Sequence, residues 1–100
     1  MSEISVLTRY RELMVDLSAQ NDRLGIARLA AQLLRELHRL PDESLEEIAR
    51  LQLLPCGVPE VDAVAAGTLR LELRRRGLTE PDWLDWHYRL IPIEGVGVGL

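Results

Sequence analysis

The most constraining feature of this chain is the stretch from Asn21 to Leu40, in which aliphatic residues recur at steps of three and four. That spacing places the aliphatic side chains on one face of an α-helix. They are Ile26, Leu29, Ala30, Leu33, Leu34, Leu37 and Leu40. Because the face is wide and almost purely aliphatic, several neighbouring elements must cover it. The stretch therefore predicts the central helix of a small helical domain.

A second amphipathic segment precedes this helix. Glu3 to Ala19 carries an apolar stripe at helical spacing, and a short polar break follows it. Asn21 in that break is a preferred N-cap residue. Two long helices joined by so short a turn are expected to lie antiparallel. We therefore predict a hairpin of Glu3–Ala19 and Asn21–Leu40, in which Gly25 either weakens the second helix or allows close approach of the first.

A capping box predicts the start of a third helix. Ser44 and Glu47 have the spacing at which each side chain bonds the other's free backbone N–H. The third helix should then run from about Leu45 to Leu54. Two prolines and a glycine between residues 55 and 59 predict a loop after it.

The fourth predicted helix runs from Glu60 to Arg76, with Gly77 as its C-terminal cap. Leu69 to Arg74 also alternates apolar and charged residues, which is a strand pattern. Leucine, glutamate and arginine form helices better than strands, so a helix is favoured. The predicted fold class is all-α, and the alternative is an α+β fold with a small sheet from residues 68–74 and 91–99.

A fifth helix is predicted to begin with Thr79 as N-cap and to run to about Leu90. The last ten residues, Ile91 to Leu100, are apolar and interrupted by glycines, which predicts an extended tail. No linker or repeat divides the sequence. The prediction is therefore a single helical domain over residues 1–100, with five helices.

Composition excludes several classes of function. No apolar run approaches the ~20 residues that a membrane-spanning helix needs. The N-terminal residues do not form a signal peptide, which predicts a cytoplasmic location. The lone cysteine, Cys56, allows no intramolecular disulfide and no CxxC motif. We predict an inert buried thiol there, although a helix N-terminus nearby would lower its pKa.

Catalytic and ligand-binding patterns are missing from the sequence. The only histidines, His38 and His87, have no metal-ligand spacing around them, and no phosphate-binding loop or nucleophile–base pattern occurs. We predict no catalysis, no cofactor and no metal.

A protein–protein interaction module, acting as a regulator or adaptor, is the preferred function. The fourth helix is apolar on two sides and the tail adds further apolar residues, so a closed homodimer is expected to cover them. Tryptophans of the fifth helix belong either to the core, which we favour, or to a partner contact. The predicted partner-binding residues are Trp83, Trp86, Leu69, Leu73, Val96 and Val98.

The alternative function is a DNA-binding regulator with a helix-turn-helix-like unit in residues 45–76. Its nucleic-acid contacts would be Arg70, Arg74, Arg75 and Arg76. Two observations oppose it: the net charge is −4, and Glu60 and Asp62 lie where a recognition helix meets DNA. Pairing of these arginines with acids of the third or fifth helix, or their plain solvation, is favoured.

Overall fold

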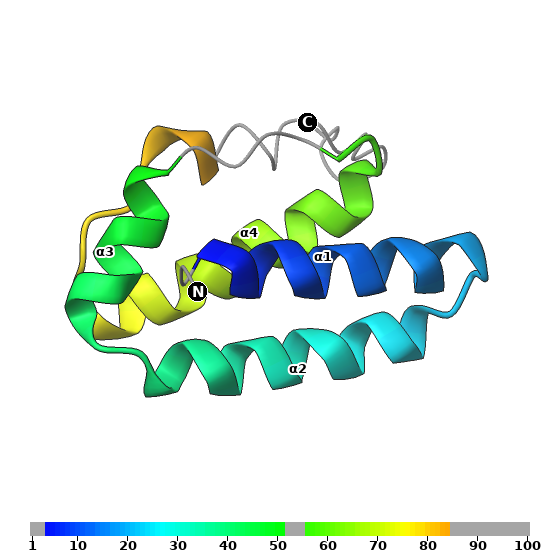
Figure 1. The fold of residues 1–100 in the computed structure, drawn as a ribbon, viewed down its shortest axis with the longest axis horizontal. Coiled ribbons are helices and arrows are strands. Elements are labelled where there is room, and N and C mark those ends of the chain that lie inside the picture. The colour runs from blue at the N-terminus through cyan, green and yellow to red at the C-terminus, as the bar shows by residue number, and fades with distance from the viewer. Residues whose placement is uncertain (1–3, 52–55, 85–100) are drawn as a thin grey trace, which may run out of the picture.

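Helices form nearly all of the regular structure in the computed structural model, which describes residues 4–51 and 56–84 (Figure 1). Four helices lie in these ranges: α1 (Ile4–Ala19), α2 (Arg23–Arg39), α3 (Asp42–Arg50) and α4 (Pro59–Arg76). Another helical segment begins at Asp82 and continues to Leu84, the last described residue. No strand occurs within the described ranges. The all-α prediction is confirmed, while the predicted tail lies outside the described residues.

α1 and α2 pack side by side and run antiparallel, as the hairpin prediction requires (Figure 1). The N-cap of α2 is Asp22 rather than Asn21: its Oδ1 accepts a hydrogen bond from the Gly25 N–H at 2.9 Å. Asn21 has a left-handed backbone with φ 62°, which asparagine tolerates better than most residues. Gly25 allows close packing, because a Cβ there would lie 3.0 Å from Leu17 Cδ1.

α3 begins at Asp42, three residues before the predicted start, so the capping-box prediction is wrong. Pro41 is the N-cap, and its carbonyl accepts hydrogen bonds from the Ser44 and Leu45 N–H groups. The fixed φ of proline suits a position just before the first turn. Ser44 therefore lies inside the helix. α3 also ends at Arg50 instead of continuing to Leu54, because the backbone of Leu51 is extended.

α4 matches its prediction closely. It begins at Pro59, and Gly77 ends it with the left-handed φ of 71°. The alternating stretch that resembled a strand is helical throughout, which contradicts the sheet proposed for residues 68–74. Residues 91–99, its other proposed strand, lie outside the described part. Leu69 and Leu73 are fully buried while Leu71 is 60% exposed, as helical spacing requires.

The helical segment after α4 starts later than predicted. Thr79 and Glu80 are not helical, and the segment begins at Asp82. The Leu84 N–H donates to the Pro81 carbonyl at 3.2 Å, so Pro81 rather than Thr79 precedes the first turn. Glu80 therefore lies outside the helical segment, and its side chain extends toward α4.

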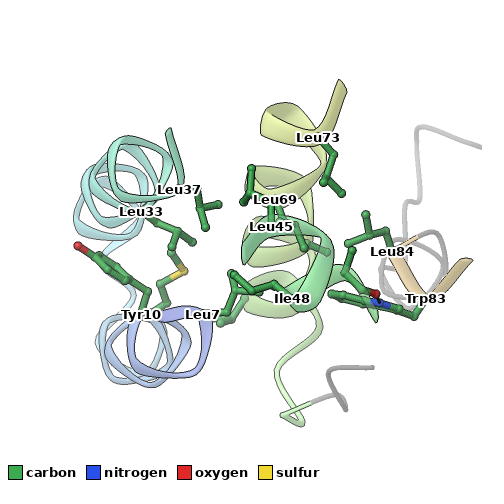
Figure 2. Packing of buried hydrophobic residues seen from close by; sticks show 14 of the residues in the cluster. Leu7, Tyr10, Leu33, Leu37, Leu45, Ile48, Leu69, Leu73, Trp83 and Leu84 are labelled. Atoms are coloured by element: carbon green, nitrogen blue, oxygen red, sulfur yellow. Dashed lines mark hydrogen bonds between the residues drawn. The ribbon is translucent and has the colours of Figure 1, made fainter. Parts of the chain in front are cut away.

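One apolar core joins all of these elements (Figure 2). Leu7 of α1 and Leu33 and Leu37 of α2 point toward Leu69 of α4, and Ile48 of α3 lies across from them. Trp83 packs on the α3 side of this core. Its Nε1–H donates to the carbonyl of Ala49 at 2.8 Å, which satisfies the one polar atom of the buried ring.

Candidate functional site

Three of the residues predicted to bind a partner are buried in the core. Leu69 and Leu73 are fully buried, and Trp83 is 7% exposed. The other three, Trp86, Val96 and Val98, lie outside the described residues. A partner cannot reach Leu69 or Leu73 without opening the core, and Trp83 presents only an edge to a hollow between α3 and the segment after α4. A contact surface on the described part of the chain must therefore consist of other side chains.

The arginines at the end of α4 are surrounded by carboxylates of the chain itself. Glu80 lies between two of them, with its carboxylate oxygens 2.8 Å from Arg70 Nε and 2.6 Å from Arg74 Nε. This contact joins α4 to the segment that follows it. It is the pairing favoured by the sequence, with an acid that precedes the fifth helix.

Glu72 engages the other two arginines of the cluster. Its carboxylate is 1% exposed and lies 2.6 Å from Arg75 Nη2 and 2.7 Å from Arg76 Nε. The hydrogen bond from Arg75 is the largest cause that lowers the pKa of Glu72 to about 2, and the Arg76 hydrogen bond adds to it against the opposing effect of burial. His38 Nδ1 lies 3.4 Å from the same carboxylate.

Arg76 also fixes α4 to the two preceding helices. Its Nη1 lies 2.9 Å from Asp42 Oδ1, in the first turn of α3. Its Nη2 donates to the carbonyls of Leu37 and His38 at 3.2 and 2.9 Å, where α2 ends. Arg76 thus donates hydrogen bonds to carbonyls that the C-terminal end of α2 leaves without a partner inside the helix. Its guanidinium is a structural group here and is poorly placed to contact a phosphate.

Cys56 lies in a second polar cluster, at the N-terminal end of α4. Asp62 is 2% exposed, and its carboxylate accepts hydrogen bonds from the Cys56 N–H at 3.0 Å and from Arg11 Nη1 at 3.2 Å. These contacts hold the start of the 56–58 loop against α1. Burial raises the pKa of the Cys56 thiol, which fits the inert-thiol interpretation.

An open groove separates the outer edges of α2 and α4. We call it the α2–α4 groove. It consists of two hollows of about 610 and 670 Å³ that follow one another along the two helices. Its apolar floor is formed by Ala27, Ala30, Leu34, Val64 and Leu71. The structure thus brings exposed and half-buried aliphatic side chains of two helices together in one groove.

Arginines dominate the rim of the α2–α4 groove. Arg23 and Glu60 lie at one end, and Arg35, Arg39 and Arg75 lie at the other. Within the described residues, Arg23, Arg35 and Arg39 have no ion-pair partner. The one acid of α2, Glu36, faces α1 instead, where Tyr10 Oη donates to it. The groove therefore combines an apolar floor with a positive rim.

Neither a metal site nor a membrane span is found in the described part. Among residues 4–51 and 56–84, no three His, Cys, Asp or Glu side chains gather as a metal site requires. None of the helices in the same ranges is both long enough and apolar enough to cross a bilayer. His87, the second histidine considered from the sequence, lies outside these ranges.

Comparison with family models, with curated proteins and with solved structures found no match for this chain. The α2–α4 groove is therefore the feature of the chain that bears most directly on function. The sequence carried one signal for it: the fourth helix was expected to be apolar on two sides, and Val64 and Leu71 form its second side. The sequence places Leu34 on the buried face of the central helix, whereas the structure leaves it half-buried in the groove floor.

Proposed function

We propose that this chain is a small protein–protein interaction module, a regulator or adaptor, and that its contact surface is the α2–α4 groove. The observation that carries the proposal is the exposed Leu71, which shares the groove floor with Leu34 and Val64. Single exposed leucines are common on protein surfaces, but a contiguous apolar floor with a polar rim is typical of interaction sites.

The two buried carboxylates support a role without catalysis. The buried carboxylates of Glu72 and Asp62 are ion-paired with arginines of the chain, and the pKa of Glu72 is lowered to about 2, far from the range that proton exchange at neutral pH requires. We propose that they are structural groups, that the chain needs no cofactor, and that it acts in the cytoplasm.

The DNA-binding alternative has less support. It requires Arg70, Arg74, Arg75 and Arg76 to face phosphates, yet each of these guanidinium groups lies within 2.8 Å of a carboxylate of the chain. Retention on heparin that falls steeply with salt, and falls again when Arg74, Arg75 and Arg76 are neutralised, would favour the alternative over our proposal.

The homodimer expected from the sequence remains a prediction. A two-fold contact presents the same patch from both subunits. If that patch were the α2–α4 groove, Arg35 and Arg39 of one copy would approach the Arg23 end of the other, where Glu60 is the one acid and already accepts a hydrogen bond from Ser18, so the second copy offers these arginines no surplus of acidic side chains. We therefore assign the groove to a different protein and leave any dimer contact to another surface.

Affinity capture with two matched variants tests the proposal. Leu71→Gln places a polar side chain in the groove, and Leu13→Gln makes the same change at a leucine of α1 that is 45% exposed. Burying a leucine at an interface contributes about 1.5–3 kcal/mol, so Leu71→Gln should weaken partner binding about tenfold or more. Proteins retained equally by the wild type, Leu71→Gln and Leu13→Gln would show that the groove is not the contact surface.

A further inference from the structure

The shape of the α2–α4 groove matches one kind of partner segment. The groove runs beside α2 from Arg23 to His38, which is about 22 Å at 1.5 Å per residue. Its two hollows follow one another, and α2 supplies Ala27 and Leu34 to them, two turns apart. Side chains of an incoming helix at positions i, i+3 or i+4, and i+7 have the same repeat. A straight apolar groove of this length therefore fits a single amphipathic helix.

The side chains that form the floor become larger along the groove, from the Arg23 end to the His38 end. Ala27 and Ala30 line the hollow at the Arg23 end, whereas Leu34 and Leu71 line the hollow at the His38 end. Alanines let the backbone of a second helix approach closely, and leucines fill the space between larger side chains. Neither feature suits a nucleic-acid duplex, whose outer surface is a polar sugar–phosphate backbone.

The rim selects the charge of that helix. Arg35 and Arg39 flank the floor on the α2 side, one turn apart, and have no carboxylate partner within the described residues. Arg75 lies across from them on α4, beside Leu71, but its guanidinium is already paired with Glu72. Arginine binds carboxylates through paired, charge-assisted hydrogen bonds. Acidic side chains along one side of an apolar stripe would therefore meet the guanidinium groups of Arg35 and Arg39.

From the floor and the rim together, we infer that the α2–α4 groove binds an amphipathic helix of another protein that carries acidic residues beside its apolar face. The inference rests on the proposed function, because it names the partner chemistry of the same groove. It adds two requirements: the partner segment is helical, and its glutamates or aspartates face Arg35 and Arg39.

Labelled peptides of about 16 residues provide the probe, since that length spans the groove. One peptide has leucines at i, i+4, i+7 and i+11 with glutamates flanking them. A second has glutamines in place of the glutamates, a third has lysines, and a fourth has the leucines scrambled. Binding to the full chain is measured by fluorescence anisotropy at about 0.1 M and about 0.5 M salt, where screening differs strongly.

The glutamate peptide should bind at least about tenfold more tightly than the lysine peptide, and the higher salt should reduce that preference. The double substitution Arg35→Gln and Arg39→Gln should weaken binding of the glutamate peptide by about two- to fivefold for each charge removed. It should leave binding of the glutamine peptide unchanged. Arg28→Gln, on the exposed outer face of α2, is the matched control and should change the binding of neither peptide. Leu71→Gln should weaken binding of the glutamate peptide and of the glutamine peptide by the same factor.

Each other result overturns the inference in a recognisable way. If the glutamate and glutamine peptides bind equally and both lose affinity in Leu71→Gln, the groove is a contact site but does not select acids, and the proposed function stands. If the scrambled peptide binds as well as the glutamate peptide, or none of the four binds, the groove does not take a helix. If a DNA duplex or a second copy of the chain displaces the glutamate peptide, the groove belongs to that ligand.

Discussion

At the scale of single residues, Glu72 is a buried polar group that links stability to pH. Its carboxylate is buried, and the Arg75 and Arg76 guanidinium groups hold its pKa at about 2 against an ordinary 4.5. A group whose pKa is lower in the folded state stabilises the fold above its unfolded pKa. That contribution is lost as the pH falls from about 4.5 toward about 2. The chain should therefore lose stability over this pH range.

Replacing Glu72 tests this linkage. A shift of this size corresponds to about 3 kcal/mol, and because Arg75 is half exposed, screening by water reduces the expected value to about 2 kcal/mol. Glu72→Gln should lower the free energy of unfolding by that amount at neutral pH. The difference from wild type should shrink as the pH falls through 4.5, because neutral Glu72 then resembles glutamine.

Urea unfolding at a series of pH values measures both effects. Glu47→Gln is the control, because it removes one negative charge from an exposed position of α3. The contrary result is a free energy of unfolding of Glu72→Gln that differs from that of the wild type by the same amount from neutral pH down to the acid range. That result would show that the ion pairs with Arg75 and Arg76 contribute no pH-dependent stability.

At the scale of elements, the end of α4 depends on one backbone conformation. Gly77 has φ 71°, its N–H donates to the Arg74 carbonyl at 3.1 Å, and the Leu78 N–H donates to the Leu73 carbonyl at 2.9 Å. This pair of bonds satisfies carbonyls that the helix end leaves free. It also turns the chain so that Leu78 packs against the core and Glu80 reaches the arginines of α4.

Substitution of Gly77 should therefore destabilise the whole chain. Gly77→Ala forces a Cβ into the left-handed region, which costs about 1–2 kcal/mol and lowers the melting temperature by about 4–8 °C per kcal/mol. Nothing lies within 4 Å of that Cβ, so the cost comes from the backbone alone. Gly77→Asn should cost less, because asparagine tolerates this conformation. Equal melting temperatures for the alanine and asparagine variants would contradict the argument.

The sequence predicts elements better than it predicts their ends or their partners. Helical periodicity and the Gly77 cap were enough to locate α1, α2 and α4. The starts of α2 and α3 were misplaced because several adjacent residues can cap a helix, and tertiary packing selects Asp22 and Pro41 among them. The rim of the groove was not predictable, since nothing in the spacing of residues places α4 beside α2.

At the scale of the whole molecule, charge is divided between two neighbouring helices. α2 has four arginines and one glutamate, whereas α3 has four acids and one arginine. The chain as a whole is negative, at −4, so the positive groove is a local exception. Long-range attraction of an acidic partner to this face should depend on ionic strength, and a second copy gains little by docking there.

If a homodimer forms, a surface other than the groove must hold it, and the apolar tail is the segment that the sequence assigns to that role. Removing Gly95 to Leu100 should then lower the melting temperature or shift the elution volume to that of a monomer. Val96→Ser with Val98→Ser and Leu100→Ser keeps the length of the chain and should have the same effect, because the expected contribution is apolar burial. A truncated chain with unchanged melting temperature and elution volume would show that the tail has no such role. A dimer that persists in the truncated chain but dissociates in Leu71→Gln would instead place the second copy in the α2–α4 groove and would overturn the assignment of that groove to a different protein.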